Sequence, residues 1–201
     1  MTDSYIKIIG LCGRSGSGKG YVSKIFASFG IPSVDTDKIY GEIVSMKDSP
    51  CLKELYREFG GDIITEEGTL DKKALSAIVF SDDKRLQKLN SITHKYILAE
   101  TEKRIEELKG NGAKAVIIDA PVLFESGFHR LCDLCVCVTC GTALSVKRIT
   151  QRDGLDEKSA EKRLSSQLSE KELRALCDYE IVNDDIEDPI SQVRDFIKCR
   201  L

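Results

Sequence analysis

The stretch GLCGRSGSGKGYVSKIF, residues 10–26, has glycines and one lysine at the spacing of a phosphate-binding loop. In such a loop a strand leads into a glycine-rich turn, and a helix follows, so that main-chain N–H groups and the positive helix end face phosphate oxygens. Gly13, Gly16 and Gly18 permit the close backbone approach, and Lys19 reaches the terminal phosphates. The pattern therefore predicts nucleotide binding.

Gly20 departs from this pattern, because the position ordinarily holds a serine or threonine whose hydroxyl coordinates Mg²⁺. The substitution removes one metal ligand but no phosphate donor, since the backbone N–H remains. Mg²⁺ commonly keeps several waters, so we expect the triphosphate and water to hold the ion, with carboxylates behind the water. Two alternatives stay open: an active phosphotransferase, or a nucleotide-binding protein that transfers nothing.

Three carboxylates come at the ends of expected strands. In VDTDKIYGEIV, Asp35 and Asp37 are expected to project to one side of an extended chain at the carboxyl edge of the sheet. Asp119 ends the apolar run VIID in the same way. One such carboxylate can deprotonate an acceptor hydroxyl and another can anchor Mg²⁺-bound water. Asp37 can also cap the helix that follows it, and the two roles are compatible.

The segment SVKRITQRDG places Arg148 and Arg152 four residues apart, on one face of a helix. Two guanidinium groups there can hold phosphate oxygens, stack on a base, or neutralise charge as a phosphoryl group moves. The alternative is a solvated basic face with no ligand. The spacing alone favours neither.

Apolar segments alternate with helical patterns along the chain, which predicts a parallel sheet covered by helices on both faces. The expected strands cover residues 5–12, 31–35, 113–121, 132–139 and 178–184. Residues from about 37 to 110 contain no convincing strand and are expected to form a helical insertion. The very polar segment from about 152 to 174 is either a solvated helical pair or a mobile lid. Without repeats or linkers, residues 1–201 are expected to form a single domain.

The composition is that of an ordinary globular chain: 201 residues, 41% hydrophobic and 31% charged, with a net charge of −3. This charge gives no reason to expect nucleic acid as a partner. The start MTDSYIKIIG lacks the features of a signal peptide, and no apolar run approaches the roughly 20 residues that span a bilayer. We expect a cytoplasmic protein with no membrane contact and no evident obligate protein partner.

The run CDLCVCVTC holds Cys132, Cys135, Cys137 and Cys140 at a spacing that resembles a metal cluster. A buried strand explains it better, because free cysteine behaves as a small apolar residue. Four ligands within one extended segment also converge poorly on a tetrahedral ion. No zinc site is expected.

Taken together, these segments resemble the dephospho-coenzyme A kinase family over nearly the whole chain. The resemblance is carried by GLCGRSGSGKG, VDTDKIY, FGGDIITEEGTLDKKALSAIVFSD, LNSITHKYI, VIIDAPVLFESGF, CDLCVCV, KRITQRDGL and CDYEIVND. It implies the three-layer α/β fold of P-loop NTPases, with a five-stranded parallel sheet, a helical acceptor-binding insertion and a lid.

The resemblance also implies that ATP, with Mg²⁺, donates its γ-phosphoryl group to the ribose 3′-hydroxyl of dephospho-CoA, and it assigns roles to residues. By this resemblance Asp37 is the base, and Lys19, Arg148 and Arg152 stabilise the phosphates. The implied nucleotide-binding positions are Gly13, Arg14, Ser15, Gly16, Ser17, Gly18, Lys19, Gly20, Tyr21, Arg148 and Asn183. The implied acceptor-binding positions are Asp37, Lys72, His94, Pro121, Leu123, Phe124 and Glu125. Asp35 and Asp119 are the carboxylates expected behind the Mg²⁺-bound water.

Three positions depart from the family pattern. Gly20 and Tyr21 replace the usual pair of hydroxyl residues. Lys72 stands where an arginine is usual, which keeps the charge but loses the bidentate fork, and Lys95 follows His94 where a proline is usual. These changes leave a third alternative open, a related small-molecule kinase with a different acceptor.

Overall fold

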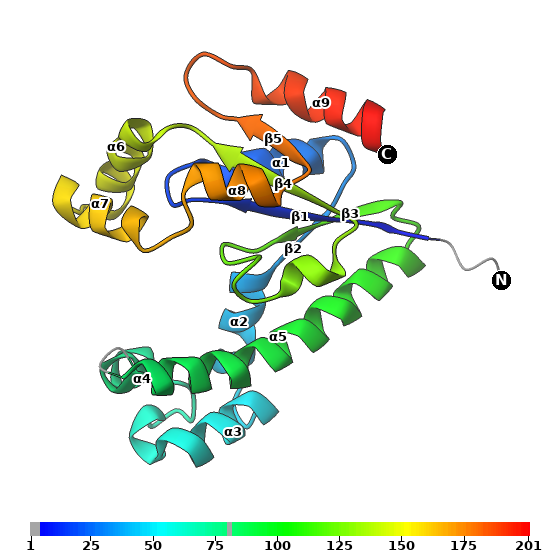
Figure 1. The fold of residues 1–201 in the computed structure, drawn as a ribbon. Helices are drawn as coiled ribbons and strands as arrows, with labels where there is room; N and C mark the ends of the chain where they lie inside the picture. Colours follow the sequence, from blue (N-terminus) through cyan, green and yellow to red (C-terminus); the bar gives the residue numbers. More distant parts are fainter. Residues whose placement is uncertain (1–4, 80–81) are drawn as a thin grey trace. The chain divides into compact units, whose positions relative to one another are not determined.

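The computed structural model describes residues 5–79 and 82–201 (Figure 1). The chain divides into two compact units, one formed by Met1–Val34 with Glu107–Leu201 and the other by Asp35–Glu106. The second unit corresponds to the helical insertion expected from the sequence. That the whole chain folds as one domain stays a prediction.

The first unit is built on a five-stranded parallel sheet, as predicted. Its strands are β1 (Lys7–Gly13), β2 (Ser33–Asp35), β3 (Ala115–Asp119), β4 (Leu134–Thr139) and β5 (Tyr179–Val182), in the order β2-β3-β1-β4-β5. β1 lies at the centre, where Ile9 aligns with Ile117 of β3 and Leu134 of β4. The carboxyl ends of the strands therefore gather at one edge of the sheet.

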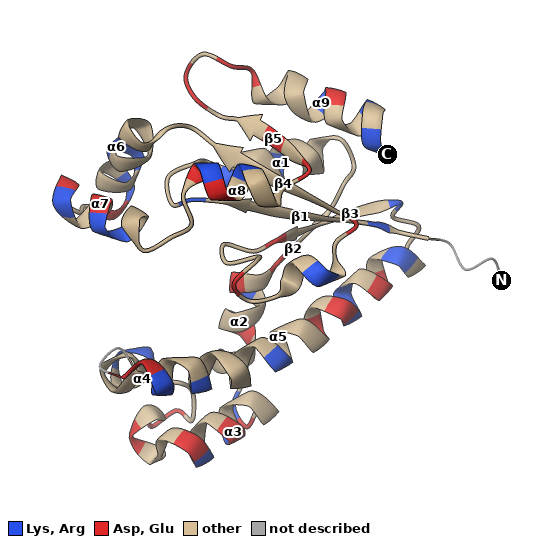
Figure 2. Ribbon diagram, viewed as in Figure 1, with Lys and Arg blue, Asp and Glu red and all other residues tan. Residues whose placement is uncertain are grey.

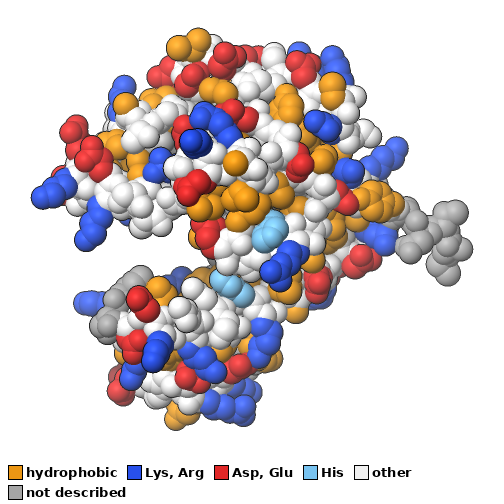
Figure 3. All heavy atoms as spheres, in the orientation of Figure 1, with side chains coloured by type: hydrophobic (Ala, Val, Ile, Leu, Met, Phe, Trp, Pro, Cys, Tyr) orange, Lys and Arg blue, Asp and Glu red, His pale blue; other side chains and the backbone are white. Residues whose placement is uncertain are grey.

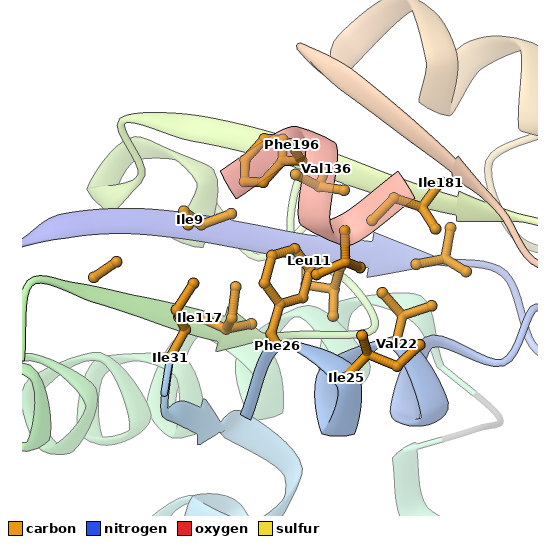
Figure 4. Packing of buried hydrophobic residues seen from close by; sticks show 13 residues of the cluster. Ile9, Leu11, Val22, Ile25, Phe26, Ile31, Ile117, Val136, Ile181 and Phe196 are labelled. Carbon is orange, nitrogen blue, oxygen red and sulfur yellow. The ribbon is translucent and has the colours of Figure 1, made fainter. Parts of the chain in front are cut away.

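One face of the sheet packs against α1 (Lys19–Ser28) and α9 (Pro189–Arg200). Alternate residues of β1, such as Ile9 and Leu11, point into this layer, which Figure 4 shows with Phe26 and Phe196. The two phenylalanine rings meet edge to face with centroids 5.8 Å apart. Such a pair stabilises the fold by about 1 kcal/mol beyond the free energy gained from burying the two rings.

The opposite face of the sheet packs against α8 (Glu170–Leu176) and the segment that includes η2 (Phe128–Leu131). Gly10 of β1 points to this face, and a Cβ there would lie 2.7 Å from Leu123. Glycine is thus required for the close approach of Leu123. The helices on both faces complete the three-layer architecture.

The polar segment expected to form a helical pair or a lid folds into α7 (Glu157–Ser165) and α8, preceded by α6 (Thr142–Asp153). α7 carries basic and acidic residues along its length (Figure 2). Its apolar side packs on α6 through Ile149, Ala160 and Leu164. The helical pair is confirmed, and the lid motion stays a prediction.

The second unit is helical in its described residues, apart from one isolated bridge between Ile64 and Leu70. It contains α2 (Thr36–Ser45), α3 (Pro50–Phe59), η1 (Gly61–Ile63), α4 (Lys72–Val79) and most of α5 (Asp83–Gly110). Its core is apolar and separate from that of the sheet, with Leu55 and Ile63 fully buried. Residues 80 and 81, within the insertion, lie outside the described residues.

The cysteine-rich run forms the buried strand β4, as predicted, with Cys135 and Cys137 in the core. All eight cysteines of the chain are free thiols.

Basic and acidic side chains are interspersed over the visible surface (Figure 3). Across residues 5–79 and 82–201, every helix is too short or too polar to cross a membrane.

Candidate active site

The predicted phosphate loop connects β1 to α1, which is the strand–turn–helix context that the motif requires. Gly16 and Gly18 have φ angles of +81° and +84°, in the left-handed region that favours glycine. A Cβ on Gly16 would also lie 2.5 Å from the carbonyl oxygen of Ser145. Backbone conformation therefore favours glycine at both positions, and the close approach of α6 excludes a side chain at Gly16.

Lys19, the first residue of α1, forms an ion pair with the carboxylate of Asp119. Asp119 ends β3, and it aligns with Leu11 of the neighbouring strand β1. Both charged side chains are largely buried, with 17% of Lys19 and 10% of Asp119 exposed. Because an isolated buried charge is costly, each group stabilises the other, and the ammonium is held beside the loop.

Arg148 of α6 joins the phosphate loop to the end of β5. Its Nη1 donates a hydrogen bond to the carbonyl oxygen of Asn183 at 2.9 Å and lies 3.5 Å from the carbonyl oxygens of Gly16 and Ser17. Its Nη2 lies 3.5 Å from a carboxylate oxygen of Asp185. The guanidinium is thereby oriented by backbone oxygens on two loops.

A depression of about 390 Å³ lies beside the glycines of the loop. It is lined by Gly16, Gly18, Arg148, Gln151 and Arg152. The prediction that the two arginines share a helix face is confirmed, because both line this hollow. Gln151 is not part of the sequence motif of phosphate sites. Only the structure shows that it lines the depression together with Arg148 and Arg152.

Arg152 makes a bidentate contact with the adjacent Asp153, at 2.7 and 2.9 Å. Asp153 also accepts a hydrogen bond from Arg163 of α7. The guanidinium groups of Arg152 and then Arg163 hold the pKa of the Asp153 carboxyl well below its usual range. Arg152 is thus part of an α6–α7 network, and it remains 61% exposed beside the depression.

Asp35 and Asp37 do not lie in one extended segment, which corrects the geometry expected from the sequence. The helix α2 begins at Thr36, so Asp37 lies in its first turn and only Asp35 belongs to β2. The helix cap is Asp35, whose carboxylate accepts hydrogen bonds from the backbone N–H groups of Asp37 and Lys38 at 2.9 and 3.0 Å. The capping role considered for Asp37 therefore belongs to Asp35.

The acceptor positions in the second unit are Lys72 and His94. Lys72 begins α4, and its ammonium lies 5.9 Å from the centre of the Tyr40 ring. His94 lies within α5, where burial lowers the pKa of its imidazole below the ordinary 6.5. Their contact with an acceptor stays a prediction.

The acceptor positions in the first unit follow β3, from Pro121 to Glu125. Phe124 packs near His129 with ring centroids 5.2 Å apart. Leu123, in the middle of this segment, is fully buried. Its present contacts are therefore those of a core residue, and its role at the acceptor also stays a prediction.

Mg²⁺ prefers hard oxygen ligands, of which carboxylates are the kind that this site offers. Among residues 5–79 and 82–201, no three His, Cys, Asp or Glu side chains are grouped so as to hold a metal ion. Asp119 is nevertheless a buried carboxylate beside the phosphate-loop lysine. This donor set fits an ion held mainly by phosphate oxygens and water, with a carboxylate behind the water.

Known proteins resemble the chain over almost its whole length. A family model described as dephospho-CoA kinase matches residues 7–188. A dephospho-CoA kinase of Corynebacterium glutamicum is 39% identical over 87% of this chain and 89% of its own length. Another, of Fusobacterium nucleatum, is 37% identical over 95% of this chain and 97% of its own. These matches do not favour the non-transferring alternative or a different acceptor.

Solved structures agree with the sequence matches. The dephospho-CoA kinase from Campylobacter jejuni has a TM-score of 0.70 and 26% identity, covering 96% of this chain and 98% of that one. The protein TT1252 from Thermus thermophilus has a TM-score of 0.85 and 26% identity, with 98% of each chain covered. Shikimate kinase from Acinetobacter baumannii has a TM-score of 0.56 and 15% identity, covering 98% of this chain and 93% of that one. At this identity the likeness shows the fold alone. The chain therefore belongs to the dephospho-CoA kinase family, a family of ATP-dependent kinases.

Proposed function

We propose that this chain transfers the γ-phosphoryl group of ATP to the ribose 3′-hydroxyl of dephospho-CoA, the last step of coenzyme A biosynthesis. The observation that carries the proposal is the phosphate loop itself, where two left-handed glycines line one depression with Arg148 and Lys19 directly follows the second of them. The relatives named dephospho-CoA kinase, which match nearly the full length, support the acceptor.

The proposed role of the first unit is to bind and neutralise the triphosphate. Loop N–H groups and the positive end of α1 face the phosphates, and Lys19 exchanges its contact with Asp119 for phosphate oxygens. Arg148 and Arg152 offset the charge that spreads over the γ-phosphoryl oxygens as the group moves. Asn183, next to β5, is proposed to border the nucleotide base.

Asp37 is the proposed general base. Its carboxylate takes the proton of the ribose 3′-hydroxyl as that oxygen bonds to the γ-phosphorus. The bond from this phosphorus to the bridging oxygen breaks, and ADP leaves. Asp37 lies in the first turn of α2, where the helix dipole favours an ionised carboxylate.

The proposed cofactor is Mg²⁺, held through water by Asp35 and Asp119 and directly by phosphate oxygens. When bound, it neutralises negative charge on the phosphates. Asp35 fits this role because its capping hydrogen bonds both go to one carboxylate oxygen, Oδ1. A cytoplasmic location, and action without an obligate protein partner, are part of the same proposal.

The test is an assay of ADP release with Mg-ATP against a panel of acceptors. Dephospho-CoA, 4′-phosphopantetheine, adenosine and shikimate differ in the hydroxyl they offer. We expect turnover with dephospho-CoA to exceed that with every other acceptor by at least about a hundredfold, the discrimination that polar contacts readily provide. Preference for another acceptor, or ATP binding without any transfer over a full Mg²⁺ titration, would overturn the proposal.

A further inference from the structure

The segment between α7 and α8 contacts the phosphate loop directly. The side-chain oxygen of Gln167 accepts a hydrogen bond from the backbone N–H of Ser15 at 2.9 Å, across 152 residues of sequence. The Nη2 of Arg14, the neighbouring loop residue, donates to the carbonyl oxygen of Leu164 at 2.5 Å. Two consecutive residues of the loop are therefore tied to the polar helical pair.

A second acceptor, at the start of α8, holds the turn that starts α6. One carboxylate oxygen of Glu170 accepts hydrogen bonds from the backbone N–H groups of Cys140 and Gly141 at 3.2 and 3.0 Å. This turn leads directly into α6, which carries Arg148. The Glu170 side chain is only 15% exposed, and its contact with Cys140 is partly buried, whereas that with Gly141 lies at the surface.

Glu170 is the first residue of the well-anchored helix α8, and Gln167 lies two residues before its cap, Ser169. α8 begins with a capping box, in which Ser169 and Glu172 satisfy each other's backbone N–H groups. Leu173 of the same helix is buried against the sheet. Glu170 is therefore held by a helix that packs on β1 and β4, and the backbone N–H of Gln167 is bonded to the carbonyl oxygen of Leu164 at the end of α7.

A neutral carboxamide at position 167 suits a contact with a loop that binds a triphosphate. A backbone N–H that the loop leaves half-buried needs an acceptor, because an unsatisfied donor is costly. A carboxamide supplies that acceptor without adding negative charge next to a triphosphate. A glutamate would supply the same oxygen but repel the nucleotide.

We propose that Gln167 and Glu170 are positioning residues for the nucleotide site. Gln167 sets the conformation of the phosphate loop through the N–H of Ser15, and Glu170 sets the start of α6 and with it the guanidinium of Arg148. Neither residue needs to touch the substrate. The inference rests on the proposed kinase function, which defines what the loop and α6 must bind.

The experiment compares Gln167→Met, which keeps the volume but removes the acceptor, with Gln167→Glu, which keeps the acceptor but adds charge. For each variant we would measure kcat, the KM for ATP, the KM for dephospho-CoA, and ATP affinity by calorimetry. Gln167→Met is expected to raise the KM for ATP roughly tenfold, the effect of losing one such hydrogen bond, and to leave the acceptor KM within about twofold. Gln167→Glu is expected to bind ATP weakly at low salt and to recover in part at high salt.

Ser169→Ala is the matched control, because it weakens the cap of the same helix without removing a contact to the phosphate loop. It should lower thermal stability while the KM for ATP stays within about twofold. If Ser169→Ala raises the KM for ATP as much as Gln167→Met does, a merely structural role explains the data and the proposal is wrong. An unchanged ATP affinity in Gln167→Met, or an equal rise of both KM values, also overturns it.

Glu170→Gln provides a second variant with the same readouts, should Gln167→Met fail to fold. This variant keeps an acceptor of the same shape but loses the charge, so the KM for ATP should rise several-fold. The kcat/KM for dephospho-CoA should fall only as far as the fraction of enzyme with bound ATP falls. Failure of the proposed function is distinguishable: wild-type protein would then show no turnover, while calorimetry would still report whether Gln167 and Glu170 control ATP affinity.

Discussion

Asn183 holds the phosphate loop from the end of β5, where its side-chain Nδ2 donates a hydrogen bond to the carbonyl oxygen of Ser17 at 2.8 Å. The same nitrogen lies against Gly18, where a Cβ would come within 1.9 Å of it. Asn183 is 7% exposed, so no water can readily replace it. The shape of the loop therefore depends on a residue that follows it by more than 160 positions.

Gly18→Ala should weaken ATP binding at least tenfold. The new methyl group would displace Asn183, and φ of +84° at this position is strained for alanine. Gly20→Ala is the matched control in the same loop, because a Cβ there meets nothing within 4 Å. Gly20→Ala should bind ATP within about twofold of wild type and should not lower the melting temperature, since alanine favours the helix. Calorimetry measures both affinities, and equal losses in the two variants would contradict this account of the loop.

Gly20→Ser restores the hydroxyl that the phosphate-loop pattern ordinarily provides. We expect the activity to saturate at lower Mg²⁺ concentration while ATP affinity stays within about twofold, because serine adds a metal ligand and no phosphate donor. The measurement is a Mg²⁺ titration of the initial rate at saturating substrates. Loss of ATP binding in this variant would show that the open space at Gly20 serves the nucleotide itself.

His94 should be neutral at physiological pH. Burial lowers the pKa of its imidazole below 6.5, so the folded state binds the proton more weakly than the unfolded state. The free energy of unfolding should therefore fall as the pH drops below about 6.5, and His94→Asn should reduce that fall. An NMR titration, with the His94 signal assigned by the same variant, should give a midpoint under 6.5. A higher midpoint would contradict the prediction.

Cys51 should resist thiol reagents that modify Cys199. Burial in the core of the second unit raises the pKa of the Cys51 thiol to about 11, from an ordinary 9.0. Roughly one molecule in a thousand then carries the Cys51 thiolate at pH 8, whereas Cys199 is exposed to the reagent. Mass spectrometry after brief alkylation should find Cys199 modified first. Equal labelling of both residues in folded protein would contradict the burial of Cys51.

Cys51 also makes a definite contribution to the pH dependence of stability. Because its folded pKa is raised, its stabilising contribution is complete below pH 9.0 and is lost as the pH rises toward about 11. The free energies of unfolding of wild type and Cys51→Ala should therefore converge over this range. A constant difference between the two proteins from pH 8 to pH 11 would exclude the effect.

The sequence predicted the elements that local patterns determine. Apolar runs placed the five strands to within two residues at each end, because buried parallel strands are nearly continuous hydrophobic segments. Glycine spacing located the phosphate loop, and a four-residue interval placed Arg148 and Arg152 on one face.

Contacts between distant segments were beyond sequence analysis. The polar run that contains Gln167 and Glu170 reads as a solvated helical pair, and nothing in its spacing indicates that Ser15 and Gly141 are its partners. The cap of α2 lies two residues before the expected Asp37, because the strand ends and the helix begins without an intervening residue after Asp35. Capping depends on where the backbone changes direction, and composition does not fix that to one residue.

The most direct test of the central claim is to follow the phosphoryl group itself in wild type and in Asp37→Asn. Protein with Mg-ATP and dephospho-CoA is monitored by ³¹P NMR, and ATP affinity is measured in parallel. We predict that wild type forms one phosphomonoester on the ribose 3′ oxygen as ADP accumulates, and that Asp37→Asn binds ATP within a few-fold but forms none. Bound ATP without any new phosphomonoester in wild type, or a phosphoryl group on another oxygen, would contradict the account.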